Sequence, residues 1–131
     1  GFMVSEITSA ALMSENKHLA NPCSTDSTPT SADQEDHVSM AAHGARRLLR
    51  MTKNLNYILG VELICGSQGV EFRSPLKTSA PLTSVLNRLR KDVQTLGNDR
   101  YLATDLEKAA HLVHSTAITD ASKIKLPELS A

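Results

Sequence analysis

Apolar residues recur three or four positions apart over residues 2–19, with polar residues between them. This period predicts an amphipathic helix. Asn21-Pro22 should end the helix, because proline lacks a backbone donor and restricts the residue before it. The residues that follow, up to Ser31, are rich in turn formers. They predict either a disordered linker or an ordered loop, and their position between two strong helical segments favours the ordered loop.

A much longer helical pattern follows. It begins near Asp33, with Ser31 and Gln34 in capping-box spacing, and its apolar positions continue to Phe72. An unbroken helix of roughly 38 residues would measure about 57 Å, whereas a compact domain of this chain length is only about 36 Å across. An apolar stripe over residues 38–61 would therefore need more protein to cover it. Three glycines could break or kink this helix, because each costs about 1 kcal/mol relative to alanine: Gly60, Gly66 and Gly69.

Shorter elements follow Ser74-Pro75. Apolar spacing predicts a third helix over residues 81–96 and a fourth over residues 105–117. The tail, residues 119–131, has little periodicity and is expected to be poorly ordered unless it docks on something. The chain then divides into two parts: residues 1–73, a helix, a loop and a long helix, and residues 74–131, the C-terminal helices and tail.

Composition favours an all-α fold. The chain has 131 residues, of which 40% are hydrophobic and 3% aromatic, and it has no Trp. A core of Leu, Ile, Val, Ala and Met suits the packing of helix on helix. Together with the length of the second helix, this composition predicts long helices that contribute to a larger helical bundle.

Charge and cysteine content limit the possible partners. The 14 basic residues balance the 14 acidic ones, which removes the electrostatic reason to expect binding to nucleic acid or to an anionic membrane. No apolar run approaches the roughly 18 residues of a transmembrane helix. Cys23 and Cys65 are too few for a disulfide framework, so a cytoplasmic location is the simpler expectation.

One run near the start of the long helix has a distinctive pattern: Thr28-Pro29-Thr30-Ser31-Ala32-Asp33-Gln34-Glu35-Asp36-His37-Val38-Ser39-Met40. It resembles the signature of the histidine ammonia-lyases, within the family of aromatic amino acid ammonia-lyases. The resemblance extends to other short runs: Ser14-Glu15-Asn16-Lys17, Asp26-Ser27, Gly44-Ala45-Arg46-Arg47-Leu48, Gln68-Gly69-Val70-Glu71-Phe72-Arg73 and, more weakly, residues 99–107. It implies that the chain is similar to the C-terminal part of such an enzyme, because family members are several times longer.

The resemblance implies an enzyme that eliminates ammonia from L-histidine to give trans-urocanate, assembled as a homotetramer around a helical core. The electrophile of the family is a methylidene-imidazolone made from an internal Ala-Ser-Gly, and this chain has no Ala-Ser-Gly. The chain also begins with Gly1 inside a predicted helix, as an internal fragment would. We therefore expect the rest of the same enzyme chain to supply the electrophile, and we expect this segment alone to be inactive.

Glu35 is the main candidate site residue, with Gln34 beside it. In the predicted first helical turn these residues could serve only as caps, stabilised by the positive end of the helix dipole. The same environment would keep a carboxylate ionised to bind a cationic amine or imidazole, or to hold a catalytic proton. The resemblance favours this catalytic and substrate-binding role for Glu35, because phenylalanine-type enzymes carry an amide where histidine-type enzymes carry an acid. Asp36 and His37 could support Glu35, and His37 could equally be a helix-packing residue.

The run departs from the family pattern in two places. Asp33 stands where the family usually has Asn, and Cys23 stands where a small Ala is common. Asp33 adds a second negative charge close to Glu35. Like charges oppose each other's ionisation, so we expect Asp33, in place of Asn, to affect activity.

Two other clusters are interpreted as solvated faces. Glu107, His111 and His114 share one face of the fourth helix, but zinc sites usually need a tighter constellation or ligands from several elements, so no metal site is predicted. The basic run over residues 46–53 lacks the aromatic residues that accompany basic side chains in nucleic-acid surfaces.

A second hypothesis is a non-enzymatic helical oligomerisation module, in which the long helix serves only assembly. An upstream Ala-Ser-Gly in the parent reading frame would support the enzyme. A natural start near Gly1 would support the module.

Overall fold

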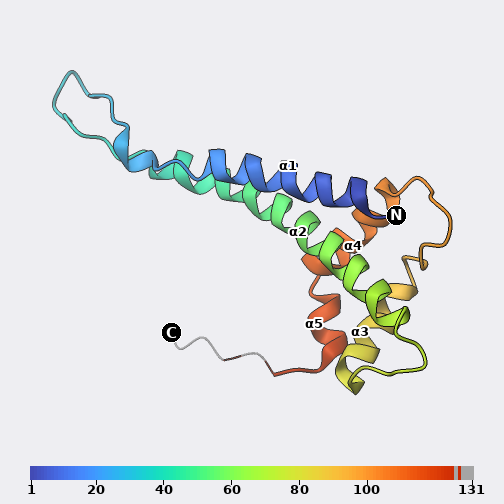
Figure 1. Ribbon diagram of the computed structural model, residues 1–131. Helices are drawn as coiled ribbons and strands as arrows, with labels where there is room; N and C mark the ends of the chain where they lie inside the picture. The colour runs from blue at the N-terminus through green and yellow to red at the C-terminus, as the bar shows by residue number, and fades with distance from the viewer. Residues whose placement is uncertain (126, 128–131) are drawn as a thin grey trace.

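The computed structural model describes residues 1–125 and residue 127. This part of the chain is helical, which confirms the predicted all-α fold. Its elements are α1 (Met3–Leu19), a 3-10 turn η1 (Cys23–Thr25), α2 (Ala41–Glu71), α3 (Ala80–Arg90), α4 (Ala103–His114) and α5 (Ala117–Ser122). Figure 1 shows α1 lying along one half of α2, while α3, α4 and α5 gather near the other end of α2. The connection between α1 and α2 projects from the opposite end of the molecule.

The core lies where the second half of α2 meets α3, α4 and the segment between them. Its buried members are aliphatic side chains, each of which contributes about 1.5–3 kcal/mol when it leaves water: Val61, Ile64, Leu89, Val93, Leu106, Ala109 and Leu112. This core occupies one end of the molecule only. The loop end is held by polar contacts instead.

The contact between α1 and α2 depends on a buried amide. Asn54 is 3% exposed, and its Nδ2 donates to Glu15 Oε2 at 2.8 Å and to Asn16 Oδ1 at 3.0 Å. Arg50 also binds Glu15, with 3.1 Å between Nε and Oε1. The hydrogen bonds from Asn54 and Arg50 together hold the pKa of the Glu15 carboxyl below its usual value. Glu15 and Asn16, part of a run that carries the family resemblance, therefore fix α1 on α2.

The long helix begins eight residues later than the sequence predicted. We expected a start near Asp33, with Ser31 and Gln34 as a capping box, but α2 starts at Ala41. The backbone at Ser31 and Asp33 has φ of 53° and 67°, which is left-handed and incompatible with a helical turn. Ser and Thr side chains in this segment bond to nearby backbone groups, and such bonds compete with helix formation.

The three glycines do not break α2, which is continuous over 31 residues, or about 46 Å at 1.5 Å per residue. Gly60 is needed for packing, because a Cβ there would lie 2.9 Å from the Ala110 nitrogen and 3.2 Å from the Ala109 carbonyl carbon. Gly66 has open space around the position of a Cβ. Of Gly60 and Gly66, only Gly60 is needed for the close approach of α4 to α2.

We expect Gly60→Ala to lower the free energy of unfolding by about 1–3 kcal/mol, because the added methyl group meets backbone atoms that cannot rotate away. Gly66→Ala is the matched control. It should be neutral or stabilising by up to about 1 kcal/mol, since alanine favours a helix over glycine. Urea unfolding followed by circular dichroism, at one protein concentration, compares the two. Equal stability of both variants would contradict the proposed role of Gly60.

The third helix is shorter than predicted, because the segment after Arg90 bonds to α2. Gln68 is 4% exposed, and its Nε2 donates to the Leu96 carbonyl at 2.6 Å while the Leu96 N–H donates to its Oε1 at 2.9 Å. Arg90 binds both carboxylate oxygens of Glu71, at 2.6 and 2.9 Å. The Arg90 hydrogen bond is the main reason that the pKa of Glu71 is lowered.

The region predicted as a tail contains a further helix. The fourth helix ends at His114, and Thr116 then adopts a left-handed φ of 61° before α5 begins. α5 packs against α3, and Ile118 lies against the core. The predicted tail, residues 119–131, thus docks through residues 119–122, which meets the condition under which we expected it to be ordered. Its last part, residue 126 and residues 128–131, lies outside the described residues.

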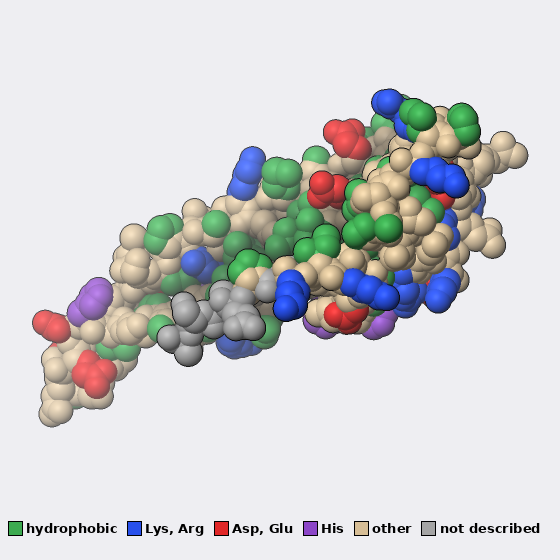
Figure 2. Space-filling model, turned by 90° about the horizontal axis from the view of Figure 1, so that it is seen from below, with side chains coloured by type: hydrophobic (Ala, Val, Ile, Leu, Met, Phe, Trp, Pro, Cys, Tyr) green, Lys and Arg blue, Asp and Glu red, His purple; other side chains and the backbone are tan. Residues whose placement is uncertain are grey.

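An apolar face of α2 stays in contact with solvent, as the length of the predicted helix implied. Its exposed fractions are 54% at Leu48, 77% at Leu49, 47% at Leu55 and 38% at Leu59. Figure 2 shows hydrophobic side chains gathered between the loop end and the helical cluster. Among the described residues, no helix is long and apolar enough to cross a membrane.

Candidate active site

The loop that carries the candidate residues connects α1 to α2 and is closed at its base by Ser27. The Val38 N–H donates to Ser27 Oγ at 2.8 Å, and the Ser27 hydroxyl lies 3.2 Å from the Val38 carbonyl, to which it donates. Both residues are half-buried, whereas the residues between them are exposed. The loop therefore projects into solvent from a defined base (Figure 1).

The tip of the loop is a tight turn held by Thr30 and Glu35. The Thr30 N–H donates to the Glu35 carbonyl at 3.0 Å, and the Glu35 N–H donates to the Thr30 carbonyl at 3.3 Å. Between them, Ser31, Ala32 and Asp33 all have left-handed φ values, of 53°, 54° and 67°. Non-glycine residues reach this region at a cost of roughly 1–2 kcal/mol each. The turn is thus a specific, strained conformation and not an open chain.

The Glu35 carboxylate lies on the outside of this turn. The Thr30 hydroxyl donates to its Oε2 at 3.2 Å, and the side chain is otherwise exposed. Within the described residues, no Lys, Arg or His forms an ion pair with it. An ionised carboxylate in this state can accept a cation that comes from outside the segment.

The predicted electrostatic origin of the site is wrong. We expected Gln34, Glu35 and Asp36 in the first turn of the long helix, where the helix dipole would stabilise their charges. Glu35 instead precedes the first residue of α2 by six positions, and the dipole effect is confined to the terminal turn. Capping of α2 by these residues, the purely structural interpretation, is excluded by the same distance along the chain.

The neighbours of Glu35 are also exposed. Gln34 and Asp36 are exposed on the same turn, and the Gln34 N–H donates to the Ser31 carbonyl at 3.3 Å. His37 lines a cavity of about 240 Å³ together with Cys23, Asp26 and other loop residues. Among the described residues, no hydrogen bond joins His37 to Glu35 or Asp36. The structure thus brings Glu35 and Gln34 together at the tip and places His37 against a separate cavity.

Two residues of the site were missed from the sequence, namely Thr30 and Ser27. A usable signal existed, because hydroxyl residues in a turn-forming run commonly bond to groups a few positions away. Sequence alone does not say which of the many Ser and Thr residues in the loop makes such a bond. The pairing depends on the left-handed turn. A glycine would indicate such a turn, but no residue between Thr30 and Glu35 is glycine.

The two cysteines are free thiols in different surroundings. Cys65 packs beside the core, as expected for a small apolar residue, and burial raises the pKa of its thiol. Cys23 lies near the start of α2, with its Sγ 3.8 Å from His43 Nδ1. Gly44 lies beside Cys23, since a Cβ at Gly44 would lie 3.8 Å from the Cys23 Cβ.

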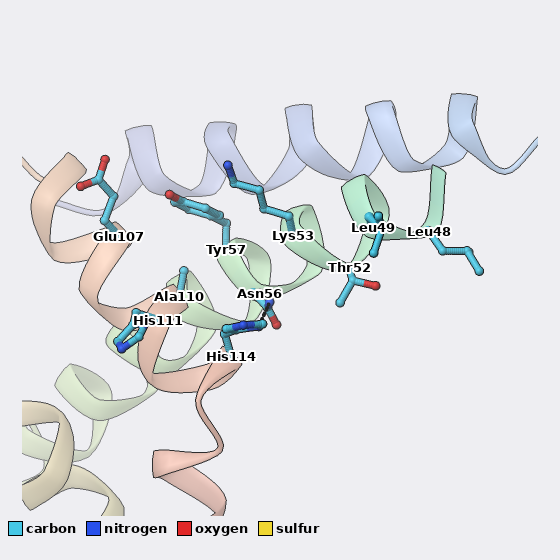
Figure 3. A pocket seen from close by; sticks show the side chains of 10 residues that line it. All are labelled: Leu48, Leu49, Thr52, Lys53, Asn56, Tyr57, Glu107, Ala110, His111 and His114. Carbon is cyan, nitrogen blue, oxygen red and sulfur yellow. Dashed lines mark hydrogen bonds between the residues drawn. The ribbon is translucent and has the colours of Figure 1, made fainter. Parts of the chain in front are cut away.

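A second depression lies between α2 and α4, with a volume of about 500 Å³ (Figure 3). His114 Nδ1 is 3.3 Å from Asn56 Nδ2, and Figure 3 shows Glu107 pointing away from His111 and His114. In the described part of the chain, no three His, Cys, Asp or Glu side chains form a group that could hold a metal ion. Glu107, His111 and His114 are all exposed on α4.

Comparison with known families identifies the fold. A sequence model of the family described as aromatic amino acid lyase matches residues 1–91, which include α1, the loop, α2 and α3. The chain belongs to the aromatic amino acid lyase family. The strained loop and the polar contacts that fix α1 on α2 are therefore features of a lyase-family chain.

Curated relatives of this lyase-family chain include proteins named histidine ammonia-lyase. The one from Roseobacter denitrificans is 68% identical over 113 residues, which cover 86% of this chain and 22% of that protein. The one from Bartonella quintana is 66% identical, with the same coverage. The chain thus spans about a fifth of the length of these relatives.

Solved structures of family members superpose well. Histidine ammonia-lyase from Trypanosoma cruzi matches with a TM-score of 0.89 and 35% identity, covering 100% of this chain and 29% of that chain. Tyrosine aminomutase from Streptomyces globisporus matches with a TM-score of 0.90 and 32% identity, covering 97% of this chain and 25% of that chain. Proteins of two different activities share this arrangement of helices, so the fold alone does not select the reaction.

Proposed function

We propose that this chain is the C-terminal part of a histidine ammonia-lyase, which eliminates ammonia from L-histidine to give trans-urocanate in histidine degradation. The observation that carries the proposal is the identity of 68% over 113 residues to a protein named histidine ammonia-lyase. Two further relatives, 66% and 64% identical, are also named histidine ammonia-lyase. Sequence, and not fold, therefore supports this reaction.

In this proposal Glu35 binds the substrate and takes part in its proton transfers, with Gln34 beside it as a second polar contact. L-histidine presents an ammonium and an imidazole, and both are complementary to a carboxylate. Support comes from the exposure of Glu35 on an ordered turn and from the lack of an ion-pair partner for it among the described residues. Asp36 and His37 are assigned only a supporting role near this carboxylate.

The remaining chemistry would come from sequence outside this chain. Electrophilic activation of the substrate would be supplied by a methylidene-imidazolone formed from an Ala-Ser-Gly, a tripeptide that this chain does not contain. The residues present are hydroxyl, amide and carboxylate groups at a loop tip, which suit binding and proton transfer. Residues 1–73 would supply the site loop and a helix of the central bundle, and residues 74–131 would supply the flanking helices.

The whole enzyme would be a homotetramer in the cytoplasm. The exposed apolar face of α2 supports assembly, since such a face needs a partner to leave water. The two free thiols are consistent with a reducing compartment. Neither nucleic acid nor a membrane is proposed as a partner.

We expect the isolated 131-residue chain to self-associate, because four leucines of α2 remain between 38% and 77% exposed. Sedimentation velocity over a micromolar concentration series measures this. Leu49→Glu, at the most exposed of the four positions, should shift the chain toward monomer without loss of helical signal. A folded monomer of the unmodified chain at every concentration would contradict the expectation.

The experiment that tests the function uses the protein encoded by the complete parent reading frame. We expect it to contain an upstream Ala-Ser-Gly and to convert L-histidine to urocanate, with L-tyrosine and L-phenylalanine turned over poorly. A reading frame that starts near Gly1 would instead support a non-enzymatic helical oligomerisation module, which the apolar face of α2 would also suit. Conversion of L-tyrosine in preference to L-histidine would overturn the substrate.

A further inference from the structure

The Thr30 side chain makes a contact that the backbone of the turn does not require. The two backbone hydrogen bonds between Thr30 and Glu35, at 3.0 and 3.3 Å, would form with any residue that has an N–H at position 30. The Thr30 hydroxyl donates a third bond, at 3.2 Å, to the carboxylate Oε2 of Glu35. This third bond acts on the side chain of Glu35 alone.

The contact changes what the carboxylate can do. An exposed Glu side chain samples several rotamers, and ordering such a side chain only in the transition state would slow the reaction. A donor that holds Oε2 selects one orientation in advance and leaves Oε1 without a described hydrogen-bond partner. A carboxylate held by one oxygen can therefore present the other oxygen in a fixed direction.

The backbone around the pair is suited to hold that geometry. The left-handed φ values of Ser31, Ala32 and Asp33 bring Thr30 and Glu35 opposite each other, and the Ser27–Val38 contacts close the loop below them. Strained backbone of this kind persists only where surrounding contacts determine it, and it is common at functional sites. The exposed tip of the loop is thus shaped around the Thr30–Glu35 pair.

We propose that Thr30 is a positioning residue, whose hydroxyl orients the Glu35 carboxylate for the substrate. The inference rests on the proposed function, because it assumes that Glu35 acts on L-histidine. Thr30 itself does not touch the substrate in this proposal. Its contribution passes through Glu35.

The test uses three variants of the full-length protein. Thr30→Val keeps the branched shape and the backbone bonds but removes the donor, whereas Thr30→Ser keeps the donor. Thr28→Val removes a nearby exposed hydroxyl that makes no hydrogen bond among the described residues, and it serves as the control. Thermal unfolding of all three is measured beside kcat and KM on L-histidine.

We expect Thr30→Val to lower kcat by roughly tenfold, because hydrogen bonds to charged groups are among the stronger ones in proteins. Its KM and unfolding temperature should change little. Thr30→Ser should retain most of the kcat, and Thr28→Val should retain all of it. A loss of kcat in Thr30→Ser as large as in Thr30→Val, or a normal kcat in Thr30→Val, would overturn the inference.

Glu35→Gln, measured in the same series, separates the positioning role of Thr30 from the proposed function on which that role rests. If Glu35→Gln lowers kcat and Thr30→Val does not, only the positioning role of Thr30 fails. If Glu35→Gln leaves kcat unchanged, the site assignment in the proposed function fails, and the role of Thr30 fails with it.

Discussion

Replacing Glu35 by Gln in the full-length protein is expected to lower kcat on L-histidine by about 100-fold or more, because groups that exchange protons with a substrate commonly contribute that much. The substitution preserves the size of the side chain and removes its charge. It also leaves an oxygen that can accept the Thr30 hydroxyl bond, so the turn should persist. Steady-state kinetics on L-histidine measure the effect.

Stability separates a functional role of Glu35 from a structural one. Glu35 is exposed and lies outside α2, so Glu35→Gln should change the free energy of unfolding by no more than about 0.5 kcal/mol, as surface substitutions usually do. Asp26→Asn removes one negative charge from the same loop and should leave kcat near normal. A near-normal kcat in Glu35→Gln would show that our main site assignment is wrong.

The second large effect is a complete loss of activity in the isolated segment. We expect the purified 131-residue chain to form no urocanate from L-histidine and to lack the ultraviolet absorbance of the imidazolone. The reason is chemical, since the tripeptide that forms the electrophile is absent from the chain and no side chain here can replace it.

The full-length protein, purified and assayed in the same way, is the control for that result. It should show both the absorbance and the conversion. Difference spectra and chromatographic detection of urocanate give two independent measurements. Urocanate produced by the rigorously purified segment would mean that the electrophile has another source, and it would contradict the expectation.

The helical class and most helix positions were predictable because they follow from local patterns. The period of apolar residues located α1 within one residue at its start, and α2 extends nearly to the predicted end at Phe72. Gly60 shows the limit of such rules, because its low helix propensity suggested a break. Its actual role, close approach to Ala109 and Ala110, depends on residues about fifty positions away.

The residues of the candidate site were proposed from the sequence, and their geometry came from the structure. Glu35 and Gln34 were selected because the run that contains them resembles a family signature, and they do lie together on one turn. Their predicted place in a helix was wrong, since capping-box spacing at Ser31 and Gln34 also occurs in turns. Left-handed conformations at Ser31, Ala32 and Asp33 are unfavourable for each residue by itself, so no local propensity predicts them.

For this protein, the sequence by itself determined the all-α class and the apolar stripe of α2, because each depends on residue type and short-range spacing. The tertiary structure decided where α2 begins and where α3 ends, and which hydroxyl meets Glu35. Those outcomes depend on contacts between distant residues, such as Gln68 with Leu96, and on a strained turn whose energy is offset by the contacts around it.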